Sequence, residues 1–194
     1  MQATNIRRTN RDRTEATRRD LIAAARRLFT EKSYAETSTP EIVAAAGVTR
    51  GALYHHFADK QALFLAVIEQ EAADVAAEIE AAFEPDDPRA ALVAGSDAYF
   101  QAMRVPGRTR LLLLDGPAVL GRTALDEIDG RHGNRTLREA LLAMMESGTM
   151  KRLPVGVLTE LLGAAYDRAA LAIEAGAPAD GYRRTLTALI DGLA

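Results

Sequence analysis

The sequence predicts an all-α protein of about nine helices, with a small N-terminal helix-turn-helix part and a larger C-terminal helical part. Three observations lead to this expectation. Tryptophan is absent and aromatic residues make up only 5% of the chain, whereas alanine, leucine and arginine are frequent, a composition that favours helices over sheets. Apolar residues recur at helical spacing along most of the chain. A length of 194 residues accommodates a module of about 50 residues beside a larger helical core.

Charge is distributed unevenly along the chain. The formal net charge is −3, but residues 1–65 hold 11 Lys and Arg against 7 Asp and Glu, whereas residues 66–194 hold 13 against 20. We therefore divide the chain at residues 65 and 66, with a basic arm at residues 1–13 that could reach DNA phosphates. Cysteine is absent, which excludes disulfides and thiolate metal sites. No apolar run approaches the ~20 residues of a membrane span, so we expect a cytoplasmic protein.

The N-terminal part is expected to contain three helices. In residues 14–32, apolar and arginine side chains fall on opposite faces of a helix. Residues 38–41, Ser-Thr-Pro-Glu, form a helix start signal for a short second helix at residues 40–46. Gly47 suits the turn that follows, and a third helix is expected from residue 50 to about residue 56. Two short helices around a glycine-containing turn are typical of a helix-turn-helix.

The C-terminal part is expected to begin with a long linking helix. Asp59 is its N-cap, and its apolar stripe continues for more than twenty residues to Phe83. Residues 85–88, Pro-Asp-Asp-Pro, then mark a turn. In the rest of the chain, glycine and proline residues mark the ends of the predicted helices. Further helices are expected at about residues 89–104, 108–114, 119–129, 134–147, 154–175 and 179–193.

One face of the third helix carries side chains that suit DNA recognition. Successive residues of a helix lie ~100° apart, so Leu53 and Phe57 fall on the packing face and Arg50, Gly51, Tyr54 and His55 on the other. Arginine can make a bidentate contact to guanine, and a tyrosine hydroxyl can bind phosphate. This pattern predicts a recognition helix, and an ordinary helical hairpin with a surface arginine is the alternative.

The amino-acid sequence of residues 17–64 resembles the DNA-binding domain of the tetracycline-repressor (TetR) family. The motifs that carry the resemblance are LIAAARRLF at residues 21–29, Tyr34, Thr39, IVAAAGV at 42–48, TRGALYHHF at 49–57, and Asp59-Lys60 followed by ALF at 62–64. The resemblance implies an all-α dimer with a DNA-binding domain, an effector pocket, and last two helices that pair across a two-fold axis. It also implies DNA contacts from Thr39, Thr49, Arg50, Gly51, Tyr54, His55 and Lys60.

Several aromatic and apolar residues of the C-terminal part are candidates for the lining of an effector pocket. Each could also be an ordinary core residue. We expect a mostly apolar lining with one or two polar groups, beside Val75 and Ile79 of the fourth helix, and a small hydrophobic or aromatic effector with no metal or cofactor. The candidate lining residues are Phe83, Tyr99, Phe100, Met103, Leu113, Met144 and Tyr166.

The last two helices are expected to form the homodimer interface. Each carries an apolar stripe that would be exposed in a monomer, and two-fold symmetry then requires a roughly palindromic operator. The candidate interface residues are Leu158, Leu161, Leu162, Ala165, Ala169, Leu186, Leu189, Ile190 and Leu193.

Other charged residues are assigned to solvent-exposed positions. Asp126 and Asp129 lie three residues apart, but with no histidine or cysteine in register they are assigned to a charged outer face rather than a metal site. His132 lies in a glycine-flanked turn and is assigned to solvent, with contact to an anionic or polar effector as the alternative.

The functional expectation is a DNA-binding repressor released by an effector. Two alternatives remain open: an activator, or a DNA binder without an effector. An enzyme is not expected, because glycine-rich phosphate motifs, Gly-x-Ser-x-Gly and His-Glu-x-x-His are missing. We therefore assign no catalytic residue.

Overall fold

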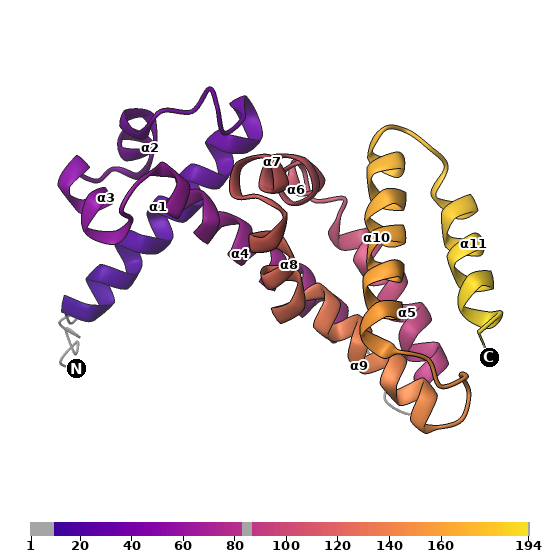
Figure 1. Cartoon of the computed structure of the whole chain (residues 1–194). Coiled ribbons are helices and arrows are strands. Elements are labelled where there is room, and N and C mark those ends of the chain that lie inside the picture. The colour runs from indigo at the N-terminus through magenta and orange to yellow at the C-terminus, as the bar shows by residue number, and fades with distance from the viewer. Residues whose placement is uncertain (1–9, 83–86, 194) are drawn as a thin grey trace, which may run out of the picture. The chain divides into compact units, whose positions relative to one another are not determined.

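The computed structural model describes residues 10–82 and 87–193, and within these residues the chain is built of helices joined by turns (Figure 1). The expected all-α class is confirmed. The chain divides into two compact units, Met1–Val67 and Ile68–Ala194. Each unit has its own core.

Unit 1 holds the helix-turn-helix. It contains α1 (Asn10–Lys32), α2 (Thr39–Ala46), α3 (Arg50–His56) and the first turns of α4 (Lys60–Ala81). Phe29 and Phe64 pack edge to face, with ring centroids 5.2 Å apart, and Tyr34 contacts both rings. This aromatic cluster and the other buried apolar residues of the unit fix how the short helices pack on α1. The largest fully buried side chains of the unit are Leu21, Phe29, Ile42, Leu53, Leu63 and Phe64.

The turn between α2 and α3 has the features that the sequence predicts. Ser38 caps α2 through a reciprocal capping box with Glu41, so α2 begins at Thr39, one residue before the expected start. Gly47 has φ 66° and ψ 28°, the left-handed conformation that closes the C-terminus of α2. Thr49 then caps α3 by accepting a hydrogen bond from the backbone N–H of Ala52 at 3.2 Å. These caps orient α3 relative to α2.

Unit 2 is a larger helical assembly. It contains the remainder of α4, α5 (Pro88–Ala102), α6 (Arg108–Arg110), α7 (Gly116–Leu120), α8 (Arg122–Arg131), α9 (Gly133–Glu146), α10 (Val155–Glu174) and α11 (Ala179–Asp191). Helix α9 packs against α5, α8 and α10, and α11 packs against α10 and α5. Figure 1 shows α10 and α11 side by side. A core that includes Leu141, Tyr166 and Ile190 lies among these helices.

The segment between α6 and α8 departs from the sequence prediction. Instead of one helix at residues 108–114, α6 passes into a π-helical turn, Leu111–Asp115, and then into α7. A Cβ atom at Gly116 would lie 3.0 Å from the Leu111 carbonyl oxygen and 3.2 Å from Leu125. Glycine therefore permits the close packing that keeps the chain helical through Gly116-Pro117, a dipeptide that from the sequence alone predicts a break between helices. Helix α7 ends at Leu120 and is followed by Gly121, which has φ 83°.

A buried ion-pair network joins α4 to α6. Arg108 is only 4% exposed and Glu71 only 3%. The Arg108 guanidinium donates to Glu71 Oε2 at 3.1 Å, to Glu78 Oε1 at 2.8 Å and to the Ala102 carbonyl at 2.8 Å. Such a network is costly to break, because a charge would remain in a poorly solvated site.

Candidate DNA-binding surface and ligand pocket

Helix α3 presents an exposed polar face. Arg50, Gly51, Tyr54 and His55 are exposed, whereas Leu53 is buried. The expected division of this helix into a packing face and a free face is therefore confirmed. The exposed residues are those whose chemistry suits DNA contacts.

Tyr54 joins the N-terminal ends of α2 and α3. The Arg50 guanidinium lies 5.5 Å from the centroid of the Tyr54 ring. Hydrogen bonds from Thr39 first, and then from Arg50, lower the pKa of the Tyr54 phenol. Thr39, Arg50 and Tyr54 thus form one polar surface at two helix N-termini, where backbone N–H groups favour anionic phosphate.

Gly51 and Thr49 extend this surface. A Cβ atom at Gly51 would meet only the Thr49 hydroxyl, at 3.9 Å, so packing within unit 1 does not require glycine here. The Thr49 oxygen accepts the capping hydrogen bond from Ala52, and its hydroxyl hydrogen can still donate to an external acceptor. Both residues suit a close approach by a DNA backbone.

Lys60 has a structural role that the sequence does not reveal. Its ammonium donates to the carbonyl oxygens of Tyr34 and Thr37, at 2.9 and 3.0 Å, and lies 4.1 Å from the centroid of the Tyr34 ring. Lys60 therefore holds the connection between α1 and α2. A phosphate contact from Lys60 would require some of these hydrogen bonds to be exchanged.

The two adjacent histidines differ in environment. His55 is exposed, whereas His56 is partly buried, and their ring centroids are 5.3 Å apart. Burial, His55 and Arg18 together lower the pKa of His56. His56 is therefore a poor phosphate-binding cation, in agreement with its omission from the expected DNA contacts.

Unit 2 contains a pocket of about 570 Å³. Tyr99, Met103, Leu113 and Tyr166 line it, as do Val75 and Ile79 of α4. The structure thus brings together four of the seven candidate lining residues.

Two of the other candidates belong to the core instead. Phe100 and Met144 are 4% and 1% exposed and lie in the hydrophobic cluster among α5, α9, α10 and α11. Their side chains fall on the packed face of their helices, which spacing alone does not distinguish from the pocket face. Phe83 lies outside the described residues.

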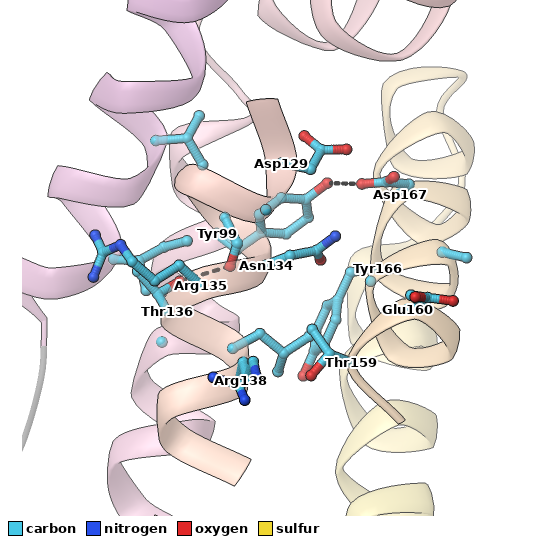
Figure 2. A pocket seen from close by; sticks show the side chains of 18 of the residues that line it. Tyr99, Asp129, Asn134, Arg135, Thr136, Arg138, Thr159, Glu160, Tyr166 and Asp167 are labelled. Atoms are coloured by element: carbon cyan, nitrogen blue, oxygen red, sulfur yellow. Dashed lines mark hydrogen bonds between the residues drawn. The ribbon is translucent and has the colours of Figure 1, made fainter. Parts of the chain in front are cut away.

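One end of the pocket is more polar than the sequence predicts. The Tyr99 hydroxyl donates to Asp167 Oδ1 at 2.8 Å. Figure 2 shows Asp129 beside this pair, with Arg138 and Thr159 toward the other end of the view. Asp129 and Asp167 are both partly buried and line the pocket. The assignment of Asp129 to a charged outer face is therefore wrong, because α8 turns this residue toward α10.

The electrostatics of the two carboxylates are coupled. Burial first, and the neighbouring Asp167 second, raise the pKa of Asp129 from 3.8 to about 6. Burial also raises the pKa of Asp167, against the opposing effects of the Tyr99 hydrogen bond and Arg122. The pocket therefore holds two acidic groups whose negative charges are poorly solvated.

Other polar groups complete the lining. The hydroxyls of Tyr166 and Ser96 are hydrogen-bonded to each other. A Cβ atom at Gly163 would lie only 2.6 Å from Asn134 Oδ1, so glycine at this position lets the Asn134 amide approach α10. No sequence motif signals these groups, because they come from α5, α9 and α10 and meet only in the folded unit.

The nine predicted interface residues fall into three sets by exposure. Leu162, Ala169, Leu186 and Ile190 are buried within the unit, and their assignment to an intersubunit contact is corrected here: they face the core of their own unit. Leu158, Ala165 and Leu193 are partly buried against the same cluster.

Leu161 and Leu189, in contrast, are 66% and 54% exposed. Leu153 and Val157 are also exposed. They are not among the predicted residues, because apolar spacing in the sequence favours the more continuous stripe, which packs inward. Val157 and Leu161 lie four residues apart on one face of α10, and with Leu153, which precedes the helix, they are called here the apolar ridge of α10.

His132 is not a solvated turn residue. Its Nε2 atom lies 2.8 Å from Glu69 Oε1, and Arg131 donates to the same carboxylate at 2.8 Å. These contacts tie the end of α8 to α4, and His132 is absent from the pocket lining. Across residues 10–82 and 87–193, no group of three or more His, Cys, Asp or Glu could hold a metal ion, and no helix is both long and apolar enough to cross a membrane.

Both units match protein-family models. Residues 21–67 match the model described as bacterial regulatory proteins of the tetR family, and residues 89–194 match the model described as tetracyclin repressor-like, C-terminal domain. The second match alone covers more than half of the chain.

Curated relatives are similar mainly over the N-terminal part. The chain is 38% identical over 88 residues to the HTH-type transcriptional regulator AcrR of Shigella flexneri, covering 44% of this chain and 40% of AcrR. It is 38% identical over 65 residues to the HTH-type transcriptional repressor AcnR of Corynebacterium efficiens, covering 34% of this chain and 35% of AcnR. The matched segments thus span less than half of either relative.

A solved structure is similar over nearly the whole length. A TetR-family transcriptional regulator from Pectobacterium atrosepticum is 31% identical, with a TM-score of 0.75, over 96% of this chain and 97% of that one. The fold, both family models and this likeness agree. The chain therefore belongs to the TetR family of DNA-binding bacterial transcriptional regulators, which are not enzymes.

Proposed function

We propose that this protein is a cytoplasmic repressor that binds a palindromic operator as a homodimer and is released when a small molecule enters the pocket of unit 2. The polar surface formed by Thr39, Arg50 and Tyr54 is the observation that carries the DNA-binding part of this proposal. The relative AcnR, which is named a repressor, supports repression over activation.

The exposed face of α3 is proposed to enter the major groove. Arg50 reads a base edge, and the hydroxyls of Thr39, Thr49 and Tyr54 position the helix on phosphates. The excess of basic residues in residues 1–65 supplies the electrostatic attraction common to all sequences. The proposed contacts are Thr39, Thr49, Arg50, Gly51, Tyr54, His55 and Lys60, with Lys60 contributing after an exchange of its present hydrogen bonds.

Replacement of Arg50 tests this arrangement. Arg50→Ala is expected to weaken binding to a selected operator duplex by ~1–3 kcal/mol, about 5- to 150-fold, and to relax the preference at one base position. Arg50→Lys is the matched control, because it keeps the charge but loses the bidentate geometry. The Arg50→Lys variant should retain its affinity for a scrambled duplex but should still lose the preference for the operator over that duplex. Equal losses for Arg50→Ala on both duplexes, measured by fluorescence anisotropy, would contradict the base-reading role.

The exposed apolar ridge of α10, together with Leu189 of α11, is proposed to pair with a second copy of the chain. A group of exposed leucine and valine side chains is unfavourable in water, and a two-fold axis would bury these side chains against their own counterparts. This set replaces the inward-facing residues of the sequence prediction. The buried residues of the same helices pack into the core beneath this surface and hold it in place.

A charge placed on this ridge should separate the subunits. Leu161→Glu is expected to shift the protein from dimer to monomer at micromolar concentration, because dimerisation would bury an unpaired carboxylate from each subunit. Leu114→Glu is the control: Leu114 is 53% exposed but lies in the π-helical turn. Light scattering should show a dimer for the wild type and for Leu114→Glu. A monomeric wild type would refute the proposed interface.

The pocket is proposed to hold the effector. Ala72, Val75 and Ile79 of α4 line it, and the same continuous helix begins at Lys60 in unit 1. If DNA binding favours one position of this helix and the ligand favours another, the ligand must weaken DNA binding, and by reciprocity DNA must weaken ligand binding by the same factor, typically ~5–150-fold. The pocket volume favours this reading over a DNA binder without an effector.

A further inference from the structure

The charges that line the pocket differ in how well they are solvated. Asp129 and Asp167 are partly buried, and their pKa values are raised mainly by burial. Among residues 10–82 and 87–193, the side-chain carboxylate of Asp129 has neither a hydrogen bond nor an ion pair. Asp167 has one hydrogen bond, from Tyr99. A buried carboxylate without a counter-charge is unfavourable, and a bound cation would remove that cost.

The remaining charged groups of the lining are already balanced or face solvent. Arg122 Nε lies 2.7 Å from Asp126 Oδ1, and both side chains are more than half exposed. Arg135 is paired with Glu80 and Glu139, neither of which lines the pocket. Arg138 and Glu160 are exposed and carry opposite charges. The net charge of the sheltered part of the pocket therefore comes from Asp129 and Asp167.

The aromatic rings of the pocket also suit a cation. Tyr99 and Tyr166 both line it, with ring centroids 5.8 Å apart in an edge-to-face arrangement. The face of a tyrosine ring carries negative electrostatic potential and attracts an ammonium group. Val75, Ile79 and Leu113 provide an apolar wall for the rest of a ligand.

We infer that the effector is an organic cation, a protonated amine on an apolar or aromatic body, with its ammonium group bound between Asp129 and Asp167 beside Tyr99. This inference rests on the proposed effector function of the pocket. It adds a positive charge to the small hydrophobic or aromatic effector that the sequence predicts. An ammonium N–H group would give Asp129 the charge-assisted hydrogen bond that it lacks.

Binding of such a cation should depend on pH. The groups that act on Asp129 come from several elements: Asp167 of α10, Arg122 and Asp126 of α8, His132 at the end of α8, and Tyr99 of α5. The pKa of Asp129 is raised to about 6, so the carboxyl must lose a proton before it can bind the cation at lower pH. An alkylamine stays protonated throughout this range. Affinity should therefore rise with pH up to about 6 and then level off.

The test uses three probes that share one hydrocarbon: 2-naphthylmethylamine, 2-naphthylmethanol and 2-naphthoate. Binding to the full chain without DNA is measured by titration calorimetry at pH 5 and pH 7. The amine should bind at least about tenfold more tightly than the alcohol at pH 7, and about tenfold more weakly at pH 5 than at pH 7. Naphthoate should bind most weakly, and the alcohol should show no such pH dependence.

Variants separate the specific site from general electrostatics. Asp129→Asn should remove most of the preference for amine over alcohol, together with the pH dependence. Asp180→Asn, an exposed substitution on α11 outside the pocket, removes the same charge and should change neither. Equal affinity for amine and alcohol would overturn the cation assignment while leaving an effector pocket in place. The cation assignment would also be overturned if the amine did not bind at about 1 mM, or if Asp129→Asn left its affinity unchanged. The DNA-binding proposal is tested independently by the Arg50 variants.

Discussion

Arg108→Met is expected to lower the free energy of unfolding by about 3–5 kcal/mol, one of the two largest effects foreseen for a single substitution in this chain. Methionine fills a similar volume but removes the guanidinium that donates to Glu71, Glu78 and the Ala102 carbonyl. Glu71 is 3% exposed and would keep its charge without this cation in a poorly solvated site. The loss would be measured by urea unfolding followed by circular dichroism.

The double variant Glu71→Gln, Arg108→Met is the control for this explanation. It removes the buried negative charge together with its partner, so it should recover part of the stability lost in Arg108→Met, and the recovery measures the coupling between the two residues. A double variant as unstable as the sum of the single changes would show that packing, rather than the ion pair, is the cause. A loss of less than about 1 kcal/mol for Arg108→Met would contradict the prediction altogether.

The helix-turn-helix could be predicted from sequence because its signals are local. The helix caps are local: Ser38, Gly47 and Thr49 each bond to partners within four residues. In a helix of only seven residues, helical geometry also places Arg50 on the exposed face once Leu53 is buried. Boundaries were therefore correct to within one residue for α2 and α3. Lys60 is the exception, because its hydrogen bonds reach 23 and 26 residues back along the chain.

The pocket could be predicted only in part because its chemistry is not local. Met103, Leu113 and Tyr166 have the apolar character expected of a lining, and they do line it. Asp129 looks like a surface residue of an amphipathic helix until α8 is packed beside Asp167, which follows 38 positions later. The exposed ridge of α10 was not predicted for a related reason. When a helix has apolar residues on two faces, its sequence does not show which face packs into the core of its own unit.

Asp129→Asn should stabilise the ligand-free protein at neutral pH. The carboxyl has its ordinary pKa of 3.8 in the unfolded chain and about 6 in the folded one, so between these values the unfolded state releases its proton while the folded state keeps it. The free energy of unfolding therefore falls as the pH rises from about 4 to about 6. Above pH 6 the folded protein bears the full cost of the ionised Asp129 carboxylate. Removing this cost should raise the free energy of unfolding by up to about 3 kcal/mol at pH 7 to 8.

The pH dependence of this gain distinguishes the charge from other effects of the substitution. The difference between Asp129→Asn and the wild type should shrink below pH 6 and be nearly absent at pH 4, as measured by urea unfolding at each pH. Asp126→Asn, one turn away on α8 and 55% exposed, should change stability by no more than about 0.5 kcal/mol at any of these values. A gain of equal size at pH 4 and pH 8 would exclude the ionised carboxylate as its source. If the gain follows the expected course, the wild-type protein retains a charge that destabilises its own fold, as is expected of a residue kept for binding rather than for stability.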